Sequence, residues 1–319
     1  MMLIDAYDAV LCDLDGVVYE GPHAIPGASQ AVEQIVQSGR RTLYITNNAS
    51  RTTEAVAQHL SDLAIPTKAD DVVSSAQAAA RVLATEHPAG SPILVVGGAG
   101  LEDALSDEGL VPVRSVDDSP AAVVQGFDPE VGWKQLAEAT FAVRAGVPWI
   151  ATNIDLTIPV ERGIAPGNGT LVSVVEQATG VTPRVAGKPE PAIFETAVRR
   201  ADAKNAIMVG DRLDTDIAGA NRAGIDSLLV LTGITGLREL AEARGIDRPT
   251  HIADSISGLF DSMPAVRSDD DGFHCGAAHA VVVDGKLIRE GAGAELARAV
   301  SSAVWAAVDA GTEVDLDGL

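Results

Sequence analysis

The chain has 319 residues, a length typical of about two domains. Its hydrophobic content of 46% and charged content of 21% are those of an ordinary globular protein, and its formal net charge is −22. Such acidity excludes the binding of nucleic acid or of an anionic membrane surface, because both need a basic face that this sequence lacks. The longest stretch without a charged residue, residues 87–101, is too short and too rich in proline and glycine to span a membrane.

The start of the chain and its cysteines predict a cytoplasmic protein. Residues 1–11 contain no basic segment and carry Asp5 and Asp8, which is unlike a signal peptide. Cys12 and Cys275 are too few for a disulfide framework.

Short apolar runs alternate with helical patterns, which predicts an α/β fold with a parallel sheet. Strands are expected at residues 9–12, 42–45, 206–209 and 227–231, and helices at residues 28–38, 53–60, 191–200 and 215–223. Residues 83–183 alternate in the same way and indicate an inserted second domain. Its strands are expected at residues 93–96 and 122–125, and its helices at residues 133–145 and 169–178.

The composition changes again near residue 264. Residues 267–272 are acidic and predict a linker, residues 277–289 predict a hairpin with an Asp-Gly turn, and residues 294–310 predict a helix. A ββα extension of this size is too small for an independent core. We therefore expect it to pack on the rest of the chain or on a second copy.

The strongest chemical signal follows the first strand, where Asp13 and Asp15 precede Gly16. Ligands bind at the carboxyl edge of parallel sheets, and two carboxylates two positions apart can point into one site there. One carboxylate can act as a nucleophile and the other as a general acid and base. The alternative is a loop in which an aspartate caps a turn, which is the commoner case for this motif alone.

Two further motifs suit phosphate binding. Thr46, Asn47 and Asn48 follow the next strand and offer a hydroxyl and backbone N–H groups to phosphate oxygens, although alone they are a common helix start. Lys188, between a glycine and a proline, supplies a cation, although alone it would be a surface turn.

The last motif follows the third strand. Asp211 is placed there to bind a hard cation through oxygen. Asp216 is expected in the first turn of the next helix, where its alternative role is helix capping.

In this order, the four motifs resemble those of the haloacid dehalogenase (HAD) superfamily. They occupy residues 13–17, 45–48, 187–191 and 210–216, and the resemblance covers about residues 9–254. The long separation of the second and third motifs resembles the class II members, which carry a large cap there. Residues 152–155 and 165–169 look like the IIA subgroup, whose members hydrolyse 4-nitrophenyl phosphate, pyridoxal phosphate, phosphoglycolate, glycerol 3-phosphate and sugar phosphates.

The resemblance implies a three-part organisation. A Rossmann-like HAD core comprises residues 1–82 and 184–264, and an α/β class II cap of the C2 type comprises residues 83–183. The ββα extension, residues 265–319, lies outside the resemblance.

The resemblance also implies a Mg²⁺-dependent phosphatase that forms an aspartyl phosphate. The nucleophile falls on Asp13, the general acid and base on Asp15, the phosphate-binding hydroxyl on Thr46 and the neutralising lysine on Lys188. The implied magnesium ligands are Asp13, the main-chain carbonyl of Asp15 and Asp211. Asp216 is implied as a residue that supports these ligands. The true dehalogenases lack the acid at position 15, because a halide leaves without a proton.

The cap is expected to choose the substrate. The implied substrate-binding residues are Thr46, Asn47, Asn48, Lys188 and, in the cap, Asn153, Asp155 and Ile158. Some pyridoxal phosphate phosphatases carry a histidine where this chain has Ile158. The isoleucine side chain cannot donate a hydrogen bond, which disfavours a pyridoxal substrate. The alternative is that Ile158 is an ordinary core residue of the cap. The whole chain looks similar to actinobacterial glycerol 3-phosphate phosphatases, which makes glycerol 3-phosphate the leading substrate.

Other functions stay open. They are hydrolysis of a sugar phosphate or phosphoglycolate, transfer of the phosphoryl group to another alcohol, and non-catalytic sensing of a phosphorylated metabolite. The large cap favours hydrolysis, and the presence of both Asp13 and Asp15 disfavours a sensor. The expected partner is a small phosphorylated metabolite, and a homodimer through the cap or the extension is a further alternative.

Two patterns resemble other sites. Residues 97–100 contain three glycines but lack the last glycine of a dinucleotide-binding motif. His274, Cys275 and His279 do not share one face of an expected strand, which disfavours a metal site.

Overall fold

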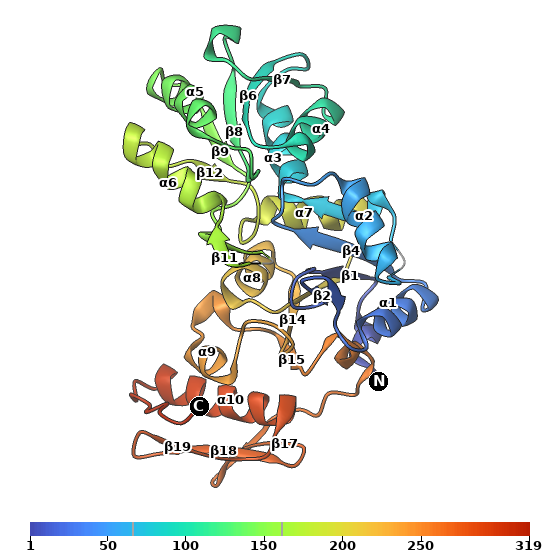
Figure 1. The fold of residues 1–319 in the computed structure, drawn as a ribbon. Helices are drawn as coiled ribbons and strands as arrows, with labels where there is room; N and C mark the ends of the chain where they lie inside the picture. The colour runs from blue at the N-terminus through green and yellow to red at the C-terminus, as the bar shows by residue number, and fades with distance from the viewer. Residues whose placement is uncertain (66, 161) are drawn as a thin grey trace. The chain divides into compact units, whose positions relative to one another are not determined.

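The structure, a computed structural model, describes residues 1–65, 67–160 and 162–319. The chain forms two compact units (Figure 1), one of residues 1–42 and 203–319 and the other of residues 43–202. Both have parallel sheets covered by helices, which confirms the expected α/β fold. In the described part of the chain, no helix is both long and apolar enough to cross a membrane.

The first unit is built on a parallel sheet with the order β15-β14-β13-β1. Its strands are β1 (Ala9–Cys12), β13 (Ala206–Gly210), β14 (Asp226–Val230) and β15 (His251–Ala253). Every residue of β1 and β13 is buried, and such strands read as continuous apolar runs in the sequence. In the register of these two strands Cys12 lies opposite Val209, so the polar residues that follow them emerge at the same edge.

Short elements connect and cover this sheet. They are η1 (Leu3–Ala6), β2 (Tyr19–Glu20), β3 (His23–Ala24), α1 (Ala28–Gln37), η4 (Leu213–Ile217), α8 (Ala218–Ala223), α9 (Leu237–Glu242), η5 (Gly245–Asp247) and η6 (Ile256–Phe260). The helix expected at residues 215–223 is α-helical only in α8, because η4 is a π-helix.

The second unit holds a pair of parallel strands and a separate five-stranded sheet. The pair is β4 (Arg41–Thr46) with β5 (Val72–Ser74), and its neighbouring helices are α2 (Thr53–Asp62), α3 (Ser75–Glu86) and α7 (Pro191–Ala201), with η2 (Ala69–Asp71) before β5. Residue 43, where this unit begins, lies within β4.

The five-stranded sheet is parallel and has the order β12-β9-β8-β6-β7. Its strands are β6 (Pro92–Val96), β7 (Val111–Val113), β8 (Ala122–Gln125), β9 (Trp149–Ala151) and β12 (Arg184–Val185). The remaining elements are α4 (Ala99–Asp107), η3 (Val116–Asp118), α5 (Trp133–Arg144), α6 (Asn168–Thr179) and the ribbon β10 (Thr157–Val160) with β11 (Gly163–Pro166). Leu94, Val123 and Trp149 belong to the apolar core of this sheet.

The C-terminal extension has two more strands than the sequence predicted. An antiparallel sheet is formed by β16 (Arg267–Asp269), β17 (Gly272–Cys275), β18 (Ala278–Val283) and β19 (Lys286–Glu290), and α10 (Gly293–Asp309) follows. The residues expected to be a linker form β16 and the turn into β17. Every residue of this edge strand is exposed, so no alternation of apolar and polar residues marks it.

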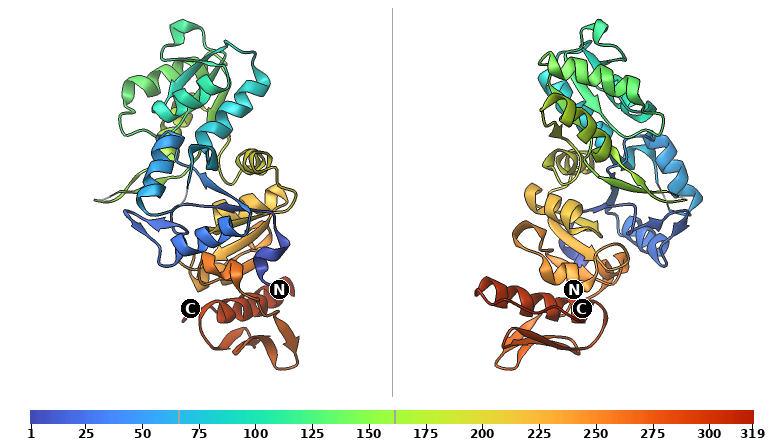
Figure 2. Two further views of the ribbon diagram at one scale, coloured as in Figure 1. Left: turned by 90° about the vertical axis from the view of Figure 1, so that its right-hand side faces the viewer. Right: turned by 60° about the vertical axis from the view of Figure 1, so that its left-hand side comes forward.

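Helix α10 lies between the antiparallel sheet and the rest of the first unit, as both views in Figure 2 show. Val300 and Val304 pack with residues of β17 and β18, whereas Ala297 packs with Leu229 and Ile252 of the parallel sheet. The indole Nε1 of Trp305 donates to the carbonyl oxygen of Leu240 at 3.1 Å. The extension is therefore docked on its own chain, which is one of the two arrangements expected from the sequence.

Removal of the extension is expected to destabilise the protein without removing any of the four motifs. A chain ending at Pro264 exposes the apolar side chains that α10 covers, so we expect lower solubility and a lower melting temperature. The milder variant Trp305→Ala loses one hydrogen bond and a partly buried indole ring, and should cost about 2 kcal/mol of unfolding free energy. Light scattering, thermal melting and phosphate release per folded molecule would test this. Loss of turnover in a well-folded truncated chain would show that the extension contributes to the site.

Candidate active site

Asp13 occupies the first position after β1 and is 8% exposed. Its backbone N–H donates to the carbonyl of Val209, and its Oδ1 accepts a 2.7 Å bond from the N–H of Leu14. Gly16 has a φ of +78°, and a Cβ there would lie 2.5 Å from the Asp211 carboxylate. The turn after Asp13 therefore requires glycine, both for its backbone conformation and for the space that Asp211 needs.

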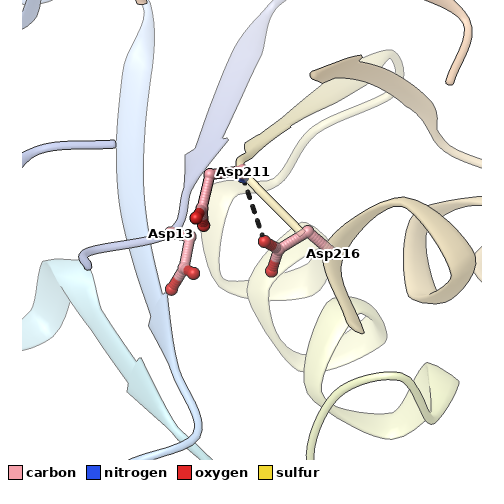
Figure 3. Close-up of side chains that lie close together, drawn as sticks. All are labelled: Asp13, Asp211 and Asp216. Atoms are coloured by element: carbon pink, nitrogen blue, oxygen red, sulfur yellow. Dashed lines mark hydrogen bonds between the residues drawn. The ribbon is translucent and has the colours of Figure 1, made fainter. Parts of the chain in front are cut away.

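Asp211 and Asp216 come from the segment that follows β13. The Oδ2 of Asp216 accepts hydrogen bonds from the backbone N–H of Asp211 at 3.2 Å and of Arg212 at 3.1 Å. The Oδ2 of Asp211 accepts one at 2.8 Å from the N–H of Ile234. Figure 3 shows the bond from Asp211 to Asp216 and the carboxylate of Asp13 beside them.

Three carboxylates are thus gathered in one buried place. One oxygen of each of Asp13, Asp211 and Asp216 lies within 4.8 Å of the other two. Asp211 is 2% exposed and Asp216 is fully buried. Neighbouring negative charges repel strongly when water is excluded, so a cation bound among these carboxylates would stabilise the cluster. Carboxylate oxygens are the ligands that Mg²⁺ prefers, so this donor set fits the predicted cofactor.

The same geometry distinguishes the individual aspartates. Asp216 faces two backbone N–H groups, which suits the supporting role expected for it. Asp15 is exposed and outside the carboxylate cluster, and its expected metal contact is a main-chain carbonyl. Burial, and then the charge of Asp13, raises the pKa of the Cys12 thiol, so Cys12 stays neutral and is no competing nucleophile.

A second group of predicted residues meets within the second unit. The side chain of Asn47 bonds the backbone of Lys188 and the carboxylate of Asp155. Asn153 donates from Nδ2 to the carbonyl of Asn47 at 2.7 Å, and its Oδ1 accepts a bond from the N–H of Asp155. Lys188 and Asn153 are 3% and 4% exposed. Four residues from three separate sequence segments are therefore held together.

The other predicted residues of this unit have more local surroundings. The hydroxyl of Thr46, at the end of β4, accepts a bond from the N–H of Asn48 at 3.1 Å. Asn48 is exposed, and its Oδ1 accepts two bonds from Ser50. Ile158 lies in the ribbon strand β10, where it pairs with Ala165.

Sequence reasoning missed two supporting residues. The hydroxyl of Ser75 donates to the carbonyl of Asn47, and Nδ2 of Asn168 donates to the carbonyl of Asn153, both at 2.7 Å. Ser75 and Asn168 are both essentially fully buried. The sequence did offer one signal for Asn168, which lies within the motif of residues 165–169 and directly after a glycine at the start of a helix.

The two patterns set aside in the sequence also have structural explanations. A Cβ on Gly98 would lie 2.2 Å from the carboxylate of Asp128, and one on Gly100 would lie 2.5 Å from the carbonyl oxygen of Arg51. These glycines permit close packing. His274 and His279 lie directly opposite each other on β17 and β18, with ring centroids 4.7 Å apart. Within the described residues, however, the aspartate cluster is the one group of three or more side chains suited to an ion.

Comparison with known proteins gives concordant matches. The model of the haloacid dehalogenase-like hydrolases matches residues 10–111, and a HAD-hydrolase-like model matches residues 185–259. The D-glycerol 3-phosphate phosphatase of Mycobacterium tuberculosis is 44% identical over 94% of this chain and 86% of its own length. The acid sugar phosphatase of Staphylococcus aureus is 41% identical over 73% of this chain and 90% of its own.

A solved structure extends the agreement to three dimensions. The glycerol phosphate phosphatase of Mycobacterium tuberculosis, crystallised in complex with magnesium, has a TM-score of 0.88 and 42% identity, and the match covers 96% of this chain and 92% of that one. The matched regions include the strand ends that carry Asp13 and Asp211. Sequence, fold and the buried carboxylates agree, and the chain belongs to the haloacid dehalogenase-like hydrolases.

Proposed function

We propose that this protein is a Mg²⁺-dependent phosphatase that hydrolyses a small phosphate monoester through an aspartyl phosphate on Asp13. The observation that carries the proposal is the buried pair Asp13 and Asp211 at the ends of two adjacent parallel strands, β1 and β13. Relatives named as phosphatases share the fold and much of the sequence.

The proposed reaction has two steps. A carboxylate oxygen of Asp13 attacks phosphorus and forms the acyl phosphate, while Asp15 protonates the leaving alkoxide to release the alcohol. Asp15 then takes a proton from water, whose oxygen attacks the same phosphorus and releases inorganic phosphate from Asp13. After the second step Asp13 is a free carboxylate and Asp15 is protonated again, so the enzyme is back in its starting state and water has supplied the atoms that the products gain.

The remaining residues handle negative charge. Mg²⁺ would be held by Asp13, Asp211 and the carbonyl of Asp15, and it would supply positive charge beside the nucleophile and the phosphoryl oxygens. We propose that the hydroxyl of Thr46 and the ammonium of Lys188 bind the phosphoryl group. Asp216 supports the cluster by fixing the backbone on which Asp211 stands.

Glycerol 3-phosphate is the substrate we propose, because the Mycobacterium tuberculosis relative named for it is similar over almost the whole chain. Sugar phosphates are the second candidates, on the likeness to the acid sugar phosphatase. Asn153, Asp155 and Ile158 are the proposed contacts to the alcohol part. We propose the cytoplasm as the location, on the composition of the sequence, and a homodimer through the cap or the extension as one form of the enzyme.

A panel of esters tests the substrate. It comprises glycerol 3-phosphate, phosphoglycolate, a hexose phosphate and pyridoxal phosphate, assayed for phosphate release with and without Mg²⁺. We expect the highest kcat/KM for glycerol 3-phosphate and the lowest for pyridoxal phosphate, since Ile158 offers no hydrogen bond. If the phosphoryl group is transferred to added glycerol instead of to water, the result would support a phosphotransferase.

Asp13→Asn is expected to lower turnover by at least about 10³-fold with the fold intact, because an amide of the same shape cannot attack phosphorus. Circular dichroism and thermal melting provide the control for folding. Mass spectrometry of rapidly quenched wild-type enzyme should find the phosphoryl group on Asp13. Near-normal turnover in the variant would remove Asp13 from the nucleophile role.

Asp15→Asn is expected to slow both steps, by about 10²- to 10⁴-fold for an alkyl ester. The loss in the first step should be smaller for 4-nitrophenyl phosphate, since its leaving group needs no proton. Single-turnover kinetics with both esters measure that step separately. Equal losses for the two esters in the phosphorylation step would contradict the acid role.

Removal of Mg²⁺ with EDTA should abolish phosphate release, and adding the ion back should restore it. Asp211→Asn should raise the Mg²⁺ concentration for half-maximal rate by more than about 100-fold, and Asp216→Asn by about 10- to 100-fold. Asp214→Asn is the matched control, because Asp214 is exposed and pairs with Arg212. A similar change in all three variants would mean that net charge, and not the cluster, sets the metal requirement.

A further inference from the structure

The two asparagines after β4 have different surroundings, although the sequence predicts substrate binding for both. Asn48 is exposed, and its side chain makes hydrogen bonds within its own loop, to Ser50. Asn47 is partly buried, and its amide reaches two segments more than 100 residues away in the sequence. The role of the Asn47 side chain can therefore be inferred from its hydrogen-bond partners.

The first of these groups is the backbone of Lys188. The Oδ1 of Asn47 accepts from the N–H of Lys188 at 2.8 Å, and its Nδ2 donates to the carbonyl of Lys188 at 3.2 Å. One amide thus bonds the peptide groups on both sides of the lysine Cα. This fixes the direction in which the lysine side chain leaves the backbone, and the residue is 3% exposed.

Gly187 provides the space for this contact. A Cβ at this position would lie 2.6 Å from Oδ1 of Asn47 and 2.3 Å from the carbonyl oxygen of Thr152. Its φ is not in the left-handed region, so close packing and not backbone conformation explains the glycine. The glycine before Lys188 and the first asparagine after Thr46 are matched to each other.

The second group is the cap loop that contains Asp155. Nδ2 of Asn47 lies 3.2 Å from Oδ2 of Asp155, and the carbonyl of Asn47 accepts from Nδ2 of Asn153. The Oδ1 of Asn153 accepts a bond from the backbone N–H of Asp155, and the carbonyl of Asn153 accepts one from Nδ2 of Asn168. The loop at residues 153–155 is therefore bonded directly to Asn47 through both Asn153 and Asp155.

We propose that Asn47 is a positioning residue, which holds Lys188 and Asp155 in one fixed arrangement and does not bind the substrate. The inference rests on the proposed function, since that function assigns the phosphoryl group to Lys188 and the alcohol to Asp155. Through these two contacts Asn47 couples phosphoryl binding to recognition of the alcohol. This differs from the direct substrate contact that the sequence predicts for it.

The test compares Asn47→Ala with the control Asn221→Ala. Asn221 also uses its Nδ2 for two bonds to backbone carbonyls, those of Ile246 and Arg248, and it belongs to no proposed site. Both variants should lower the melting temperature, whereas Asn47→Ala alone should change the kinetics. If Asn47→Ala does not fold, Asn47→Ser, which leaves a smaller gap, is measured in the same way.

Three readouts separate positioning from other roles. In Asn47→Ala, binding of inorganic phosphate with Mg²⁺, measured by calorimetry, should weaken about tenfold or more, because Lys188 loses its orientation. The kcat/KM for 4-nitrophenyl phosphate should fall by about 10- to 100-fold, and that for glycerol 3-phosphate should fall further. The losses from Asn47→Ala and Asp155→Ala on glycerol 3-phosphate should be less than multiplicative, because both variants remove one shared contact.

Two results would overturn the proposal. One is unchanged phosphate binding together with unchanged turnover of 4-nitrophenyl phosphate, with a lower melting temperature as in the control. The other is a higher KM confined to glycerol 3-phosphate, which would indicate direct substrate contact. Failure of the proposed function is distinct, because the wild type would then release phosphate from no ester, whereas calorimetry with inorganic phosphate would still test Asn47.

Discussion

The mutual repulsion of three buried carboxylates is the constraint on which the candidate site depends. Asp13, Asp211 and Asp216 bring oxygens within 4.8 Å of one another where little water reaches them. At such distances and low effective dielectric constant, like charges disfavour one another by several kcal/mol. Backbone N–H groups offset part of this repulsion, because at least one of them donates a hydrogen bond to each carboxylate. A divalent cation bound among these carboxylates would lower their repulsion, so the energetic cost of the cluster and an affinity for Mg²⁺ would have the same origin.

Crowding around the same carboxylates explains three glycines in the first unit. A Cβ on Gly16 or Gly233 would lie 2.5 Å or less from the side chain of Asp211, and one on Gly210 would lie 2.2 Å from that of Asp216. Only Gly16 also needs a positive φ. The glycines therefore follow from the space that the aspartates occupy, and larger residues there would displace the side chains of Asp211 and Asp216.

The parts predicted from the sequence are those fixed by local chemistry. Buried parallel strands are continuous apolar runs that end in polar residues, so the positions of Asp13, Thr46 and Asp211 at strand ends could be expected. The edge strand β16 could not, because all its residues are exposed and its pairing with β17 depends on a partner that local patterning does not show. The bonds of Asn47 were hidden for a related reason: an asparagine after a strand has many uses, and its partners lie more than 100 residues away.

The overall charge gives these long-range contacts their importance. A chain with 45 acidic and 23 basic residues repels a phosphate ester at a distance, so attraction must arise locally. A flexible lysine would satisfy that need poorly, because a solvated ammonium is screened and loses entropy when it is ordered. Burying Lys188 and fixing its backbone through Asn47 meets that entropy cost during folding, before substrate arrives. In the proposed function, preorganisation of this kind is the reason for an acidic protein to use the partly buried amide of Asn47 to position a single cation.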